Sequence, residues 1–210
     1  ETFSQLAANL SAVVNNKNFV FWRAFGYSAL VTIVSLALLV LFGAMAAWVI
    51  CRNKAKWSTV IYMIFISSMI IPFQVVMLPL VATFREAGNF VGLAMNGSIP
   101  GLIFAYCGFG GAMTVFILTG FIKGVPYELE EAAKIDGCGQ LRTFGVIVLP
   151  LSKAMLATMT LFSFVSYWNT YFSSVMYMTS AAKSTLQVYV QKVVLSSNVS
   201  EMVDLTNELA

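Results

Sequence analysis

Charged side chains are scarce in this chain of 210 residues, and histidine is absent. Charged residues make up 10% of the sequence and hydrophobic residues 59%, whereas a soluble globular domain has about 25% charged residues. Without histidine the chain lacks the commonest general base and metal ligand. Cys51, Cys107 and Cys138 have no metal-ligand spacing, and an odd number is a poor disulfide framework. The composition therefore favours a membrane protein and argues against a catalytic or metal site.

Two further absences limit the partners of this chain. The formal net charge is only +3, and the basic residues do not form the aromatic-interleaved patch of nucleic-acid binders. Nucleic acid is therefore not an expected partner. No GxxxxGK[ST] phosphate-binding loop occurs in the sequence, so no cofactor is expected in this chain and ATP would have to be bound elsewhere.

Four long blocks without charge dominate what is present. Each exceeds the roughly 20 apolar residues that a helix needs to cross a bilayer, so the sequence predicts an all-α, polytopic transmembrane helical bundle. Pro72 and Pro79 are expected to bend or interrupt the second span, and Pro100 to begin the third. The stretch 87–101 before the third span reads as a loop with a short half-helix. The predicted spans are about 24–51, 57–84, 99–121 and 154–180.

The short loops predict the orientation of the bundle. With four spans, the loop around residues 52–56 and the polar segment 123–153 lie on the same side of the membrane. Together they carry seven of the twelve basic residues: Arg52, Lys54, Lys56, Lys123, Lys134, Arg142 and Lys153. By the positive-inside rule this side is cytoplasmic.

The polar segment 123–153 contains the pattern of a short helix. Pro126 is placed at the first helical position, acidic residues follow near the amino end, and Gly137 is placed for a left-handed cap. One face would carry Val125, Leu129, Ala132 and Ala133. A second helix from Gly139 to Val148 would end before Pro150. An ordinary solvated loop explains the charges equally well on this pattern alone.

The spacing of seven residues in this segment decides between these readings. It is EAA, three residues, Gly, nine residues, Ile, one residue, Leu-Pro, carried by Glu131, Ala132, Ala133, Gly137, Ile147, Leu149 and Pro150. This resembles the signature loop of the membrane subunits of binding-protein-dependent ABC importers. The stretches "IIPFQVVMLPL", "GVPYELEEAAKIDG" and "FVSYWNTYF" resemble the maltose-type carbohydrate permeases, in the second of their two subunit types.

The resemblance implies that the segment is a coupling helix that docks into a cytoplasmic ATPase subunit. By position, Glu131 would contact the ATPase, Ala132 and Ala133 would permit close approach, and Gly137 would make the turn, braced by Asp136. Leu149 and Pro150 complete the coupling set. The implied partners are a second homologous permease subunit, two ATPase subunits that bind ATP and Mg, an extracellular solute-binding protein and the lipid bilayer. The implied location is the cell membrane of a bacterium or archaeon, crossed several times.

Permeases of this type I importer kind usually have six spans, whereas four are predicted here. We therefore expect residues 1–210 to form one permease domain that lacks its first and last helices in this chain.

A solute pathway needs polar or aromatic side chains that face a water-accessible cavity. Each candidate also has a structural reading, as an interfacial aromatic or an interhelical hydrogen-bonding residue. The candidates are Gln74, Ser166, Tyr167, Trp168, Asn169 and Tyr171, with Asn96 and Ser163 as further possibilities.

The hypothesis is thus a permease subunit of an ATP-driven importer for carbohydrate, with an oligosaccharide as the leading substrate. The alternative within the family is a sugar-phosphate such as glycerol 3-phosphate. A secondary transporter or channel subunit would need buried acids in its spans, and the uncharged blocks contain none. A membrane enzyme would need converging acids, bases or metal ligands. Only the acids of the polar segment could serve, and their spacing is better explained by the amino end of a helix.

Overall fold

The computed structural model describes residues 3–5, 7, 11, 21–92, 95–178 and 184–195, without the side chain of residue 91. Every element bounded in this part of the chain is helical. The elements are α2 (Phe21–Arg52), α3 (Lys56–Ile70), α4 (Phe73–Val91), α5 (Ile99–Ile122), α6 (Glu128–Ile135), α7 (Gln140–Thr143), the π-helix η1 (Phe144–Val148), α8 (Leu149–Leu151), α9 (Lys153–Asn169), α10 (Phe172–Tyr177) and a helix at Leu186–Leu195.

Two of the described helices, α2 and α5, are long and apolar enough to cross a membrane. They contain the predicted ranges 24–51 and 99–121. Four spans result if two bent helix pairs each count as one: α3 with α4, bent by 108°, and Gln140–Leu151 with α9, bent by 77°. The fold is thus an all-helical bundle with several apolar helices.

The predicted range 57–84 is divided between two helices. α3 ends at Ile70, and Ile71 adopts an extended conformation with ψ 117° before Pro72, because a residue that precedes proline is disfavoured in the helical region. α4 then leaves at a steep angle. Pro79 stays inside α4, and the Thr83 hydroxyl donates to the Pro79 carbonyl oxygen at 2.9 Å.

The predicted range 154–180 is also divided. α9 ends at Asn169, Thr170 is extended with ψ 108°, and α10 follows. The last two residues of the prediction, 179 and 180, lie outside the described residues.

The stretch between the second and third spans is more helical than its glycines suggested. α4 continues through Asn89 to Val91, where Gly92 adopts the left-handed conformation with φ 71° and ends the helix. The expected loop therefore begins later than predicted. α5 starts as the sequence indicated, with Pro100 in its first turn and with the Ser98 hydroxyl accepting a hydrogen bond from the Gly101 N–H at 3.2 Å.

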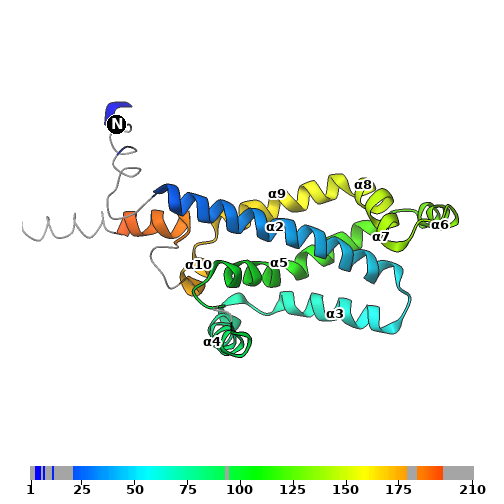
Figure 1. Ribbon diagram of the computed structural model, residues 1–210, viewed down its shortest axis with the longest axis horizontal. Helices are drawn as coiled ribbons and strands as arrows, with labels where there is room; N and C mark the ends of the chain where they lie inside the picture. Colours follow the sequence, from blue (N-terminus) through cyan, green and yellow to red (C-terminus); the bar gives the residue numbers. More distant parts are fainter. Residues whose placement is uncertain are drawn as a thin grey trace, which may run out of the picture.

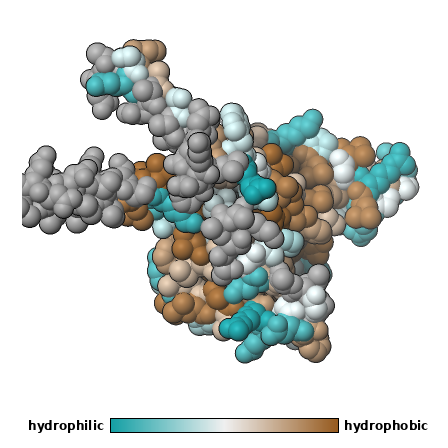
Figure 2. Space-filling view, turned by 60° about the vertical axis from the view of Figure 1, so that its left-hand side comes forward, coloured by the Kyte–Doolittle hydropathy of each residue, from teal (hydrophilic) through white to brown (hydrophobic). Residues whose placement is uncertain are grey.

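The two ends of the bundle differ in character (Figure 1). α2, α5 and α9 run along the long axis, α6 and the turn between α2 and α3 lie at the right-hand end, and α4 lies crosswise near the other. The basic loop at 52–56 and the polar segment 123–153 thus share one end, as the predicted orientation requires. Figure 2 shows hydrophobic residues over much of the flank and hydrophilic residues at the right-hand tip.

Small residues allow α5 to pack closely against its neighbours. A Cβ atom on Gly43 of α2 would lie 2.7 Å from the Thr114 Cγ2 atom. A Cβ atom on Gly110 would lie 1.8 Å from the Tyr167 hydroxyl oxygen, which donates to the Tyr106 carbonyl oxygen at 2.8 Å. Backbone approach at small residues is the usual means of association between helices in lipid.

We expect the substitution Gly110→Ala to destabilise the protein. The added methyl group would displace the Tyr167 hydroxyl, and overpacking of this kind costs about 1–3 kcal/mol. Gly108→Ala is the matched control, because nothing lies within 4 Å of a Cβ atom there. The measurement is the temperature at which the detergent-solubilised protein loses its monodisperse elution. Equal midpoints for the two variants would contradict the packing described.

Candidate functional site

The short helix α6 has a well-defined end. Gly137 has a φ of 80°, its N–H donates to the Lys134 carbonyl oxygen at 3.0 Å, and the Cys138 N–H donates to the Ala133 carbonyl oxygen at 2.9 Å. This pair of hydrogen bonds is a Schellman motif. The predicted left-handed cap at Gly137 is confirmed.

The second helix of the segment does not end before Pro150, as the sequence had suggested. α7, η1 and α8 follow one another without a break from Gln140 to Leu151. Across the wide π turn, the Leu149 N–H donates to the Phe144 carbonyl oxygen. Pro150 then lies in the first turn of α8, where a missing N–H does little harm.

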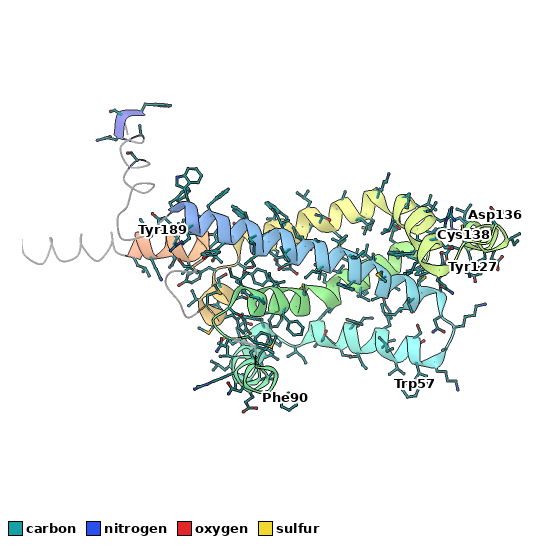
Figure 3. The ribbon with its side chains drawn as sticks, in the orientation of Figure 1. Trp57, Phe90, Tyr127, Asp136, Cys138 and Tyr189 are labelled. Atoms are coloured by element: carbon teal, nitrogen blue, oxygen red, sulfur yellow. The ribbon has the colours of Figure 1, made fainter. Side chains whose placement is uncertain are left out.

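The outward face of the segment carries part of the predicted coupling set. Glu131, Ala132, Asp136 and Pro150 are exposed, whereas Leu149 is half-buried and Ala133 is buried. Figure 3 places Asp136 and Cys138 at the far tip of this end.

The predicted apolar face of α6 is wrong in two positions. Leu129 and Ala132 are exposed, and the buried positions of this helix are Glu130 and Ala133. Burial of Glu130 rotates the helix relative to the apolar pattern, because its carboxylate has partners on α2.

Glu130 is a buried charged residue of α6 that the sequence pattern did not reveal. Its side chain is 1% exposed and accepts two hydrogen bonds: from the Arg52 Nε atom to Oε1 at 2.8 Å and from the Trp48 Nε1 atom to Oε2 at 3.0 Å. The Arg52 Nη2 atom also donates to the Val125 carbonyl oxygen at 2.9 Å. The sequence did contain one indication of such a residue. Trp48 and Arg52 place two hydrogen-bond donors one helical turn apart at the end of a span, where they need an acceptor.

Electrostatic interactions stabilise the contact between Glu130 of α6 and Arg52 of α2. Arg52 is 17% exposed in its side chain, and its guanidinium also lies 5.4 Å from the centre of the Tyr127 ring. An ion pair so far removed from water is little screened by salt. Removing one partner of a buried pair costs about 3–5 kcal/mol because the other charge is left unpaired.

A cavity of about 820 Å³ lies between α3, α5, α9 and α10. Its wall includes both helix breaks, at Ile71 and at Thr170. Aromatic rings and hydroxyl groups line it, among them Ser68, Tyr106, Phe109, Thr114, Phe162, Ser163, Ser166, Tyr167 and Ser173.

The structure brings some of the solute candidates to this cavity and leaves others elsewhere. Ser163, Ser166 and Tyr167 line it, and Tyr106, which the sequence did not single out, stacks on Tyr167 at 4.8 Å. Trp168 instead packs against Phe25 and Phe164, each at 5.6 Å.

The remaining candidates do not line this cavity. Gln74 is exposed on α4, and Tyr171 immediately precedes α10. The Asn169 amide nitrogen donates to the Val165 carbonyl oxygen at 2.8 Å. Asn96 has a buried side-chain oxygen but does not belong to this wall.

Comparison with known proteins decides the family. Residues 39–203 match the model of the binding-protein-dependent transport system inner membrane component. This chain belongs to that family. The predicted resemblance to the membrane subunits of binding-protein-dependent transport systems is thereby confirmed, as is a membrane location.

Two relatives of this chain have sugars or starch degradation products in their names. It is 41% identical to the probable starch degradation products transport system permease protein AmyC of Thermoanaerobacterium thermosulfurigenes over 71% of this chain and 52% of the relative. It is 35% identical to the melibiose/raffinose/stachyose import permease protein MelC of Bacillus subtilis over 79% of this chain and 58% of the relative. The chain thus spans little more than half the length of these curated relatives.

A solved structure has the same fold. It is the crystal structure of a bacterial ABC transporter involved in the import of the acidic polysaccharide alginate, with a TM-score of 0.76 and 23% sequence identity over 89% of this chain and 62% of that chain. The likeness confirms the predicted fold of an importer permease.

We expect Gly137→Ala to loosen the permease's α6, because a side chain in the left-handed conformation costs about 1–2 kcal/mol. Amide hydrogen exchange in residues 128–138 should become roughly fivefold faster or more. Gly139→Ala serves as the control, since Gly139 has a φ of −68° that alanine adopts freely. Equal protection in the two variants would mean that the cap does not hold α6.

Proposed function

We propose that this chain is the membrane-spanning permease subunit of an ATP-driven importer for carbohydrate, with segment 123–153 as its coupling element. The observation that carries the proposal is the exposed Glu131–Ala132 face on a helix whose opposite side is pinned to α2 through Glu130. Such a helix offers a partner a rigid surface, because its contacts with α2 hold it in place when the partner pushes or pulls on it.

The chemistry of the exposed face fits an ATPase partner that has a basic residue beside an apolar cleft. Glu131 supplies a negative charge, and Ala132 leaves room for close approach. Ile135 and Leu141 are 86% and 73% exposed. Apolar side chains that project from the polar end of a membrane protein are typical of a protein interface.

The energy source is assigned to two separate ATPase subunits. The sequence has no phosphate-binding loop, and the family is defined by dependence on a binding protein. ATP and Mg would bind to those subunits, and closure of the ATPase pair would move α6. A second permease subunit would complete the pathway, and the extracellular binding protein would deliver the solute.

The cavity between α3, α5, α9 and α10 is the proposed solute pathway within this subunit. Hydroxyl groups and aromatic faces suit a sugar ring, which has polar edges and apolar faces. In the described part of the chain, no lysine or arginine lines this cavity, so a neutral carbohydrate fits it better than a sugar-phosphate. The substrates in the names of AmyC and MelC support the same class.

The proposal is tested by purifying the complete transporter through a tag on this chain and placing it in liposomes. We expect two copies of an ATPase and a second permease to copurify. Maltotriose, raffinose and diacetylchitobiose, each with the binding protein, are compared with glycerol 3-phosphate for stimulation of ATP hydrolysis. Uptake that follows an ion gradient and needs no ATP would support a secondary transporter instead.

We expect Glu131→Ala to weaken the ATPase contact. Loss of a hydrogen-bonded charge at an interface should lower the amount of copurified ATPase, and with it uptake, by about tenfold or more. Glu86→Ala is the control, because this exposed glutamate lies on α4 at the other end of the bundle. Full ATPase recovery with Glu131→Ala would show that this carboxylate is not part of the docking surface.

We expect Ser166→Phe to block the solute without disturbing the ATPase. The added ring would occupy space in the cavity and reduce uptake by about tenfold or more, while ATPase copurification stays normal. Val165→Phe is the matched control, because Val165 is the preceding residue, is 50% exposed and is not part of the cavity wall. Equal uptake by both variants would show that the solute does not pass through this cavity.

A further inference from the structure

We infer that Glu130 is the positioning residue that transmits movement of the coupling helix α6 to α2, and through α2 to the wall of the cavity. The inference rests on the proposed function, since it assumes that an ATPase moves α6. It assigns the transmission to one carboxylate, distinct from the exposed Glu131 that would meet the ATPase.

The first step is the attachment of α6 to the bundle. In the described part of the chain, the side-chain hydrogen bonds between α6 and a long helix both end on Glu130. Glu131 and Ala132 are exposed, and Ala133 contributes only a methyl group to the buried side. A displacement of α6 therefore reaches α2 most directly through this carboxylate.

The second step is the geometry of the clamp. Trp48 and Arg52 are four residues apart and so lie on one face of α2, and each donates to a different oxygen of Glu130. Arg52 also donates to the Val125 carbonyl oxygen and lies over the Tyr127 ring. The amino end of α6 is therefore held on two sides, which allows it to push as well as pull the last turn of α2.

The third step is the path along α2. This helix runs from Phe21 to Arg52 without a break, whereas α3 meets α4 at a bend of 108° and Gln140–Leu151 meets α9 at a bend of 77°. Leu39 of α2 lies in one buried cluster with Tyr106 and Tyr167, and both tyrosines line the cavity. An unbroken helix thus joins the carboxylate clamp to the cavity wall.

The same contacts would also suit a brace that only holds α6 in place. The two roles differ in what a weakened clamp changes. A brace alters the amount of folded transporter, whereas a transmitting contact alters the solute moved for each ATP hydrolysed.

The experiment compares Glu130→Gln with the unmutated chain in the complete transporter. Glutamine keeps the length of the side chain and an acceptor for Trp48, but it removes the charge that holds Arg52. We expect ATPase subunits to copurify as before, and uptake of the stimulating sugar per ATP hydrolysed to fall at least about fivefold, the low end of typical coupling between sites. Glu128→Gln is the control, because it removes the same charge from an exposed position of α6 and should change neither quantity.

A second variant keeps the test decisive if Glu130→Gln is not recovered from the membrane. Arg52→Lys retains the positive charge beside Glu130, but one ammonium group cannot reproduce the contacts to Glu130, Val125 and Tyr127. It should lower uptake per ATP in the same direction by a smaller factor. Unchanged uptake per ATP in the recovered variants would overturn the inference and leave the pair as a brace. Loss of the ATPase subunits would also overturn it, since Glu130 would then serve docking.

The outcome separates this inference from the proposed function. If the unmutated chain brings down no ATPase, the proposed function fails. If it does so and imports sugar under ATP, while Glu130→Gln behaves like the Glu128→Gln control, only the transmission inference fails.

Discussion

A carboxylate that is 1% exposed must find donors within the protein, and this requirement arranges the polar end of the bundle. Glu130 finds them on α2, in Arg52 and Trp48. Successive residues of a helix are about 100° apart around its axis. With Glu130 bound to α2 and Ala133 buried on the same side of the helix, Glu131, Ala132 and Ile135 must therefore turn outward. The buried pair thus decides which part of the signature loop a partner can meet.

The middle of the bundle is governed by a second constraint, the absence of water in the bilayer. Backbone that is not helical is tolerated at membrane depth only where protein or a cavity surrounds it. The breaks at Ile71 and at Thr170 both belong to the wall of the 820 Å³ cavity. The proline that ends α3 and the extended residue that ends α9 therefore do more than bend helices. They place polar backbone and hydroxyl groups at the wall of the cavity that we propose as the solute pathway.

Much of this arrangement could be predicted from local patterns, and the rest required knowledge of distant contacts. The uncharged blocks predicted the positions of α2 and α5, and Gly137 predicted its own cap. Pro72 indicated where the second block breaks but not the 108° bend, which depends on how α4 packs. The helix dipole alone explains three glutamates at a helix amino end, so this pattern did not indicate that Glu130 is buried. That burial depends on a distant contact, because its partner Trp48 is 82 positions away in the sequence. Trp168 was a candidate for stacking on a sugar, but its ring packs against the rings of Phe25 and Phe164.

α2 is the element on which both constraints meet. Its last turn holds the carboxylate of Glu130, and its middle packs on α5, where Gly43 allows Thr114 to approach so closely that even a Cβ atom would clash. A contact this tight does not slide, because any shift along it would force side chains into one another. α2 and α5 therefore have the geometry of one rigid body. The helices across the cavity, α3 and α9, are the ones that end in breaks, so a change of angle between these parts would be absorbed at Ile71 and Thr170 rather than within α2.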